Sequence, residues 1–209
     1  VLLERQDQHD EAIPYLERAA ATYPLLADYA LAYLATAHRS AARSADAAAT
    51  LRRLLDQHPQ SLFVAGASRN LPRDLLDAGD LPLAEEASGK YLATFPNGAG
   101  RAEAWVTLGE VLLRAGRAEQ AEEVLHRVWV ELPGTPESLR AKEVLDTIPT
   151  ARSFSVEEQF QRAKTLYQLG RYPEALVELA PFASPGDSKE TQARLLLGIA
   201  AFRSRQYSQ

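Results

Sequence analysis

The sequence predicts an all-α protein, an α-α superhelix (solenoid) built from antiparallel helix pairs. Residues 101–133, RAEAWVTLGEVLLRAGRAEQAEEVLHRVWVELP, have the pattern of two amphipathic helices joined by a tight turn at Gly116. Prolines that would end the second helix of a pair recur every 35 to 37 residues, at Pro24, Pro59, Pro96 and Pro133. A fixed period of this size indicates that one helix-pair unit repeats along the chain.

The stretch 101–133 meets the requirements of a tetratricopeptide unit position by position. Trp105 supplies the bulky residue of the first helix, and the small residues Gly109 and Ala121 allow the two helices to approach closely. Gly116 can adopt the positive φ that ends a helix. Pro133 has no N–H to continue the second helix. The chain is therefore predicted to be a series of tetratricopeptide-like antiparallel helix pairs.

The apolar spacing places the helices one after another. A helix is predicted to end within Val1–Arg5, and further helices are predicted over 10–23, 25–39, 44–57, 61–78, 80–95, both halves of 101–133, 136–147, 156–169, 173–182 and 191–204. Pro72 predicts a break near residues 70–72. Asp80 is a candidate N-cap, and Ser155 with Glu158 predicts a capping box. The connection at 40–46 lacks the turn glycine of the other pairs.

These elements group into a domain organisation. Residues 1–148 are predicted to form helical repeats, with units near 1–24, 25–59, 60–96 and 98–133 and an extra helix at 136–147. Residues 149–155 are predicted to be a linker. Residues 156–209 are predicted to hold further, truncated repeats, and the sequence as a whole is interpreted as a fragment of a longer protein.

Composition narrows the functional classes. The 209 residues carry a net charge of -5 and no cysteine, which argues against general nucleic-acid binding and excludes disulfides and cysteine chemistry. A run of about 18 apolar residues, as a membrane span needs, does not occur in the sequence. The four histidines are scattered and are interpreted as surface residues. We predict no catalytic residue, cofactor or metal in this fragment.

One predicted surface has a functional interpretation. In stacked helix pairs the first helices line the concave face. Aligning the repeats places there Tyr29, Arg39, Arg69, Arg73, Glu110, Arg114, Phe160, Lys164, Tyr167, Phe202 and Arg203. Because Arg can hold a carboxylate with two hydrogen bonds, one hypothesis is a groove for an anionic or carboxylate-bearing partner. The alternative is an ordinary solvated helix surface whose aromatic residues belong to the core.

Beyond the generic repeat, the order of the units resembles the N-terminal helical region of bacterial soluble lytic murein transglycosylases. The segments that carry the resemblance are PLLADYALAYLATA, SLFVAGASRNLPRDLLDAGDLPLAEEASGKYLATFP, RVWVELPGTPESLRAKEVL and EEQFQRAKTLYQLGRYPEALVEL. The resemblance implies a periplasmic protein and a C-terminal lysozyme-like catalytic domain in the same parent chain, which cleaves the peptidoglycan glycan strand.

The resemblance carries no catalytic residue onto this sequence. The catalytic Glu of the family stands in a Glu-Ser context, and Glu137–Ser138 is the one such pair here, without the surrounding family motif. We interpret this pair as the first turn of a helix. The resemblance thus implies a non-catalytic scaffold, whose basic face would hold the glycan strand or its acidic peptide stems.

Two other functions fit the same repeats. The first alternative is a tetratricopeptide-repeat adaptor that mediates protein–protein interactions in a cell-envelope complex. The second is a regulatory sensor domain of a cytosolic protein, since a chain without cysteine suits the cytoplasm as well as the periplasm. A lysozyme-like domain after Gln209 would separate the scaffold of a lytic enzyme from the adaptor, and a signal peptide upstream of Val1 would count against the cytosolic sensor.

Overall fold

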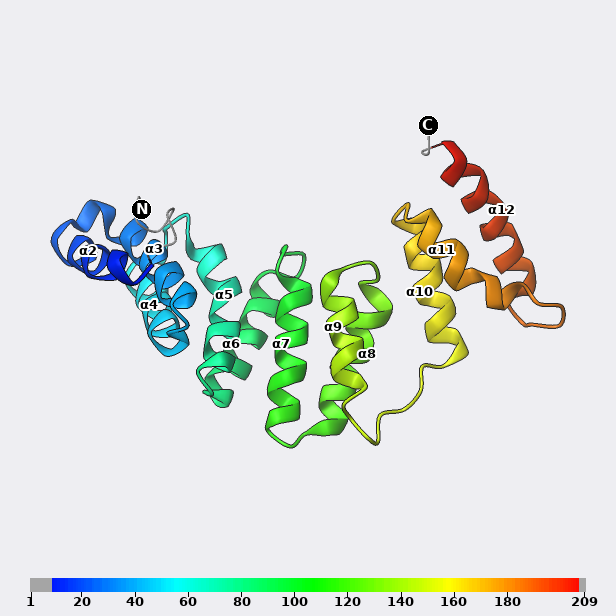
Figure 1. Cartoon of the computed structure of the whole chain (residues 1–209), viewed down its shortest axis with the longest axis horizontal. Helices are drawn as coiled ribbons and strands as arrows, with labels where there is room; N and C mark the ends of the chain where they lie inside the picture. Colours follow the sequence, from blue (N-terminus) through cyan, green and yellow to red (C-terminus); the bar gives the residue numbers. More distant parts are fainter. Residues whose placement is uncertain (1–8, 207–209) are drawn as a thin grey trace. The chain divides into compact units, whose positions relative to one another are not determined.

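The computed structural model describes residues 9–206, and all the regular structure of these residues is helical (Figure 1). The helices are α2 (His9–Thr22), α3 (Ala27–Ser40), α4 (Ser44–Gln57), α5 (Val64–Asp77), α6 (Leu81–Thr94), α7 (Arg101–Arg114), α8 (Ala118–Glu131), α9 (Pro136–Leu145), α10 (Val156–Gln168), α11 (Tyr172–Leu179) and α12 (Glu190–Gln206). Two short 3-10 turns, η1 (Pro24–Leu26) and η2 (Ala180–Ala183), precede α3 and follow α11. The all-α class is confirmed; the helix end predicted at Val1–Arg5 lies outside the described residues.

The chain divides into two compact units, Val1–Arg117 and Ala118–Gln209, called unit 1 and unit 2 below. In unit 1, each helix from α2 to α7 packs against the next one along the chain, and α7 also contacts α5. In unit 2, α8 packs against α9 and α10, α10 against α11, and α11 against α12. This succession of neighbour contacts is what a helical-repeat chain requires.

The core of unit 1 consists mainly of alanine and leucine. Its larger cluster runs from α2 to α7 through residues that include Leu31, Leu51, Leu54, Leu76 and Val111. Small alanines between them let neighbouring helices approach closely. The core of unit 2 is more aromatic, because Phe160 of α10 meets Phe182 of η2 edge to face, with ring centroids 5.2 Å apart.

The predicted break near residues 70–72 is wrong. Helix α5 is continuous from Val64 to Asp77 with Pro72 inside it. A proline in a helix interior costs about 3 kcal/mol, since it removes one backbone hydrogen bond and crowds the preceding turn. Pro72 itself is fully buried, and Leu71, Leu75 and Leu76 anchor the same turn in the core. Burial of several such side chains, worth about 1.5–3 kcal/mol each, outweighs the penalty.

The predicted caps are confirmed. The side chain of Asp80 accepts a hydrogen bond from the N–H of Leu83 at the start of α6. Ser155 and Glu158 form a complete capping box at the start of α10. Each uses a short side chain to satisfy N–H groups that the first helical turn leaves unpaired.

The connection without a turn glycine makes the same turn with an alanine. Ala42 adopts φ 57°, and its N–H bonds to the carbonyl of Arg39 while the N–H of Arg43 bonds to that of His38. Gly116 makes the equivalent turn after α7 with φ 76°. Both are the double hydrogen-bonded helix end that favours glycine in the left-handed position.

We expect Ala42→Gly to stabilise unit 1, because a Cβ in the left-handed region is strained by about 1–2 kcal/mol. The greater entropy of glycine in the unfolded chain offsets part of this gain, leaving about 0.5 kcal/mol. Urea denaturation would measure the change. Ala41→Gly is the matched control, since Ala41 has φ -83° and should be destabilised instead. Equal effects of both substitutions would contradict the explanation.

Candidate functional site

Two of the basic residues predicted on the first helices of unit 1, Arg39 and Arg73, are held in ion pairs one repeat apart. Arg39 of α3 donates from Nε to Oδ1 of Asp74 at 2.7 Å and from Nη2 to Oδ2 at 2.6 Å. Asp74, on α5, is 1% exposed. The Asp74 hydrogen bonds raise the pKa of Arg39 above its usual value. Arg39 is therefore already occupied by a carboxylate of this chain.

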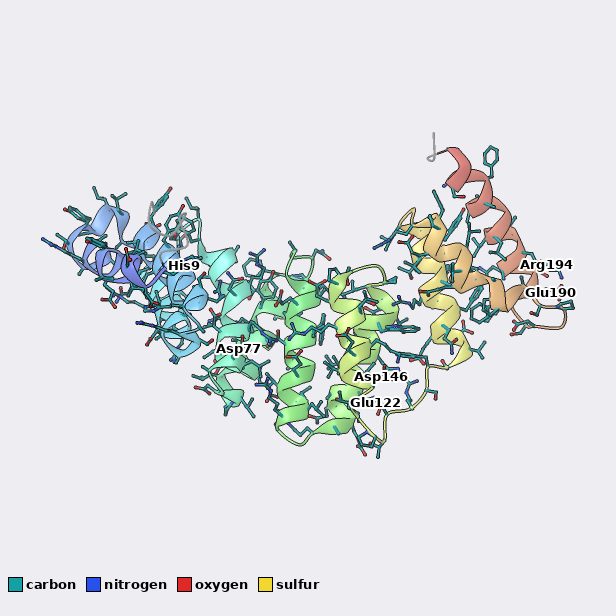
Figure 2. All side chains as sticks on the ribbon, viewed as in Figure 1. His9, Asp77, Glu122, Asp146, Glu190 and Arg194 are labelled. Atoms are coloured by element: carbon teal, nitrogen blue, oxygen red, sulfur yellow. The ribbon has the colours of Figure 1, made fainter. Side chains whose placement is uncertain are left out.

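A second pair links α5 to α7. Nη1 of Arg73 donates to Oε2 of Glu110 at 2.8 Å, and its Nε donates at 3.1 Å to Asp77 of the same helix. Asp77 is labelled in Figure 2. Arg114 of α7 donates to the backbone carbonyl of Leu76 at 3.2 Å, in the last turn of α5. These partners are 37 and 38 residues apart in sequence. The predicted basic face is thus an inter-repeat ladder, in which carboxylates of this chain neutralise Arg39 and Arg73 while Arg114 keeps its charge.

The two other predicted residues of unit 1 pack against their surroundings. Tyr29 meets Phe63 edge to face at 4.8 Å between ring centroids and stays 44% exposed. Arg69 is exposed, but its aliphatic part lies so close to Gly100 that a Cβ there would collide with it. Its Nε makes one long hydrogen bond of 3.4 Å to Oδ1 of Asn70. Arg69 and Arg114 are therefore the cations of this set that no carboxylate within residues 9–206 neutralises.

A groove lies between α3 and α5, with α4 beneath it. Its volume is about 210 Å³, and it is lined by Ala32, Tyr33, Ala35, Thr36, Arg39, Leu51, Phe63, Gly66, Ala67 and Asn70. The small residues leave space for a ligand. The Tyr33 hydroxyl and the Asn70 amide NH₂ make no hydrogen bond within residues 9–206. The groove therefore offers neutral donors and acceptors rather than free positive charge.

The predicted residues of unit 2 are divided between core and surface. Phe160 is 3% exposed and belongs to the core, so its assignment to a binding face is wrong. Tyr167 is half-buried against Tyr172, and Nη1 of Arg203 donates to the Tyr172 hydroxyl at 3.0 Å. Lys164 is half-buried, whereas Phe202 is 65% exposed. Apart from the pairing of Arg203 through Tyr172, the structure brings none of them together into a cluster.

Sequence reasoning missed Arg162, a buried cation of unit 2 with partners on three other helices. It is 6% exposed. Its Nη1 donates to the carbonyl of Trp129 at 2.6 Å and to the hydroxyl of Ser138 at 2.8 Å. Its Nε donates to Glu178 at 3.0 Å, and the guanidinium lies 4.3 Å from the centre of the Trp129 ring. One side chain of α10 thus joins α8, α9 and α11.

Ser138 has a structural role in this arrangement. As predicted, Glu137–Ser138 forms the first turn of a helix: α9 begins at Pro136, and Thr135 caps it by accepting from the N–H of Ser138 at 3.1 Å. The Ser138 side chain is fully buried and receives the Arg162 hydrogen bond. The Ser138 hydroxyl therefore serves as a buried hydrogen-bond acceptor that joins α9 to α10.

Residues 149–155 are irregular and are anchored to α8 and α10. The Phe154 ring stacks on Trp129 at 3.8 Å between ring centroids, and it meets the His126 ring at 4.3 Å with the two planes tilted by 39°. Arg152 donates to both oxygens of Glu158 at 2.7 and 2.6 Å, which holds the pKa of that carboxyl well below its usual range. A cavity of about 480 Å³ lies beside this segment. Figure 2 labels Asp146, which lines this cavity directly after α9, and Glu122 of α8.

The interpretation of all histidines as surface residues is wrong for two of them. His126 is 3% exposed and His38 is 5% exposed. His126 lies between two carboxylates, with Nδ1 3.4 Å from Glu158 and Nε2 3.8 Å from Glu122. Within residues 9–206, no group of three or more acidic and histidine side chains is arranged to hold a metal ion.

Comparison with known proteins agrees with the repeat architecture. Two tetratricopeptide repeat family models match the chain, one over residues 1–61 and the other over residues 75–145. No curated protein sequence gives a significant match. The crystal structure of a tetratricopeptide repeat protein from Parabacteroides merdae is similar, with 15% identity and a TM-score of 0.49 over 95% of this chain and 94% of that chain.

The helices form pairs joined by turns that contain a residue with positive φ, and two tetratricopeptide repeat models match the chain. These features define a helical-repeat protein of the kind that forms scaffolds for protein–protein interaction. This chain is a tetratricopeptide-like helical-repeat protein. None of its described helices combines the length and the apolar character that crossing a membrane requires.

Proposed function

We propose that this chain is an adaptor that binds an extended peptide segment of a partner protein in the groove between α3 and α5. The observation that carries the proposal is the chemistry of that groove. Small residues leave room along it, and Asn70 and Tyr33 present unused hydrogen-bonding groups at its walls. An extended peptide exposes one backbone donor and one acceptor per residue, and a side-chain amide can satisfy both.

The ion pairs favour a neutral partner segment over a strongly acidic one. Arg39 lines the groove, but both oxygens of buried Asp74 already hold its guanidinium. An acidic peptide would have to compete with this bidentate pair. Recognition therefore depends on the peptide backbone and on small or apolar side chains that fit between α3 and α5.

A tryptophan at Gly66 tests this site. Gly66 lines the groove, and a Cβ built on it meets no atom within 4 Å, so the new side chain fills the groove without disturbing α5. Peptides would be selected from a random dodecapeptide display library with the intact chain, and their affinities measured by fluorescence anisotropy. We expect Gly66→Trp to weaken the selected peptides at least tenfold.

The matched control is Gly89→Trp. Gly89 is also helical, also has open space around its Cβ position, and does not line the groove. It should leave peptide affinity within twofold of the original chain. Equal affinity of both variants for every selected peptide, or a library that yields no binder, would overturn the proposed site.

The resemblance to lytic murein transglycosylases favours a second function, that of a periplasmic scaffold beside a peptidoglycan-cleaving domain. Its support is the order of the four quoted sequence segments, which lie on α3, on α5 and α6, on α8 and α9, and on α10 and α11. In this function the partners are the glycan strand and a catalytic domain of the same parent chain.

Cosedimentation with purified peptidoglycan sacculi tests the scaffold function. The chain should be recovered with the sacculi at physiological salt, and a lysozyme-like domain should be encoded after Gln209. If the chain stays in the supernatant and only helix pairs are encoded downstream, the scaffold function is contradicted and the adaptor is the remaining proposal.

A further inference from the structure

A second groove of unit 1 opens between α4 and α6, with α5 as its floor. Two adjoining cavities of about 210 and 240 Å³ share Leu55, Leu71, Ala87 and Lys90, so they form one continuous depression. It differs from the groove between α3 and α5, whose floor is α4. We call it the α4–α6 groove.

The floor of the α4–α6 groove is a stripe along one face of α5. Val64, Ser68, Leu71 and Leu75 line it at intervals of four, three and four residues, the spacing of one helix face. At 1.5 Å per residue this stripe is about 16 Å long, or three helical turns. Val64 and Ser68 are half-buried and Leu71 and Leu75 are buried at the base of the groove, so the stripe suits a ligand whose apolar ridge reaches down to α5.

The rims of the α4–α6 groove carry charges that the fold does not use. Arg52 and Asp56 lie on α4, and Glu86 and Lys90 lie on α6. All four are exposed, and none makes an ion pair or hydrogen bond within residues 9–206. The charges on α3 and α5 differ from these rim charges, because Arg39 and Arg73 both form ion pairs with carboxylates of this chain.

We infer that the α4–α6 groove docks an amphipathic helix of a partner protein whose apolar stripe is flanked by residues of both signs. Each rim presents one cation and one anion four residues apart, about 6 Å along the helix axis. A helix that seats its apolar ridge on the α5 stripe brings its flanking residues to these rims, where acids meet Arg52 or Lys90 and bases meet Asp56 or Glu86.

Mixed rims select against other occupants. The four rim charges sum to zero, so they do not attract an anionic membrane surface or a nucleic acid. A helix is the occupant that the α5 stripe favours, because its spacing of four, three and four residues matches the apolar ridge of another amphipathic helix. With a peptide between α3 and α5, unit 1 would hold two partners through two separate grooves.

The test uses three synthetic 14-residue helical peptides with one common leucine stripe. Their flanking positions are all Glu, all Lys, or one Glu and one Lys on each side. Anisotropy with the intact chain should show the mixed peptide binding at least tenfold tighter than either single-sign peptide, with the difference shrinking at 0.5 M salt.

A double variant, Arg52→Glu with Lys90→Glu, makes all four rim residues acidic. It should shift the preference at least tenfold toward the all-Lys peptide, and a gain of affinity cannot result from misfolding. Gly66→Trp, which fills the groove between α3 and α5, should leave mixed-peptide binding unchanged. The experiment therefore tests the α4–α6 groove independently of the groove proposed for the extended peptide.

Three binding results would overturn the inference. They are equal binding of the three peptides, an unchanged preference in the double variant, and loss of mixed-peptide binding in Gly66→Trp. Self-association of the chain that the double variant abolishes in sedimentation velocity would also overturn it, by making a second copy the occupant.

Discussion

Replacing Arg162 with methionine should destabilise unit 2 by about 3 kcal/mol. The substitution keeps much of the side-chain volume but removes the donors to Trp129, Ser138 and Glu178. Breaking a buried, hydrogen-bonded charge pair from one side costs about 3–5 kcal/mol, because the remaining groups lose their partner. Glu178 is 31% exposed and can reach water, which places the expected cost at the lower end.

Urea denaturation of the intact chain measures this effect. The chain has two tryptophans, one in each unit, so a Trp105→Phe background reports on unit 2 alone. Arg194→Met is the matched control, since Arg194 is 57% exposed and pairs with Glu190 within α12 (Figure 2), with one further exposed hydrogen bond of 3.2 Å to the carbonyl of Ala183. Such a surface pair is worth at most about 0.5 kcal/mol. A similar loss in both variants would show that Arg162 has no special role.

Asp74→Asn should destabilise unit 1 by about 2–3 kcal/mol. The amide keeps the shape of the side chain but replaces one acceptor with a donor that faces the Arg39 guanidinium. Asp74 is 1% exposed, so water cannot replace the lost interaction there. Arg39 is 35% exposed and can turn toward solvent, which keeps the cost below that of a fully buried pair.

Asp77→Asn provides the comparison. Asp77 is in the last turn of the same helix, pairs with Arg73, and is 38% exposed. Its substitution should change the free energy of unfolding by less than about 0.5 kcal/mol. Trp105 fluorescence in a Trp129→Phe background reports on unit 1. An effect of Asp74→Asn no larger than that of Asp77→Asn would contradict a buried inter-repeat bond.

The sequence predicted the parts of this fold that depend on the spacing of residues within one helix or turn. The apolar period located each described helix within a few residues, and Asp80, Ser155 and Gly116 marked ends that depend on one helical turn. The break predicted at Pro72 is wrong because the outcome there depends on contacts between distant parts of the chain. The cost of a proline is local, but the burial that offsets it comes from residues of other helices.

The candidate site was less accessible to sequence reasoning, because its chemistry depends on partners far along the chain. Arg39 looks free until Asp74, 35 residues later, is placed beside it. Arg162 looks like one more surface charge until α8, α9 and α11 surround it. A repeat alignment assigns residues to a face, whereas pairing between repeats decides which of those residues a ligand can use.

The ladder between first helices also limits how such a chain can evolve. Arg39 finds Asp74 and Arg73 finds Glu110 because the donor and the acceptor lie about one repeat apart. Excising residues 60–96 would bring Val111 to the place of Asp74 and leave the Arg39 guanidinium without its acceptor. The repeats are therefore not interchangeable modules. Duplication or loss of one repeat would have to be accompanied by new charged residues in its neighbours, so the ion pairs constrain the order of the repeats during evolution.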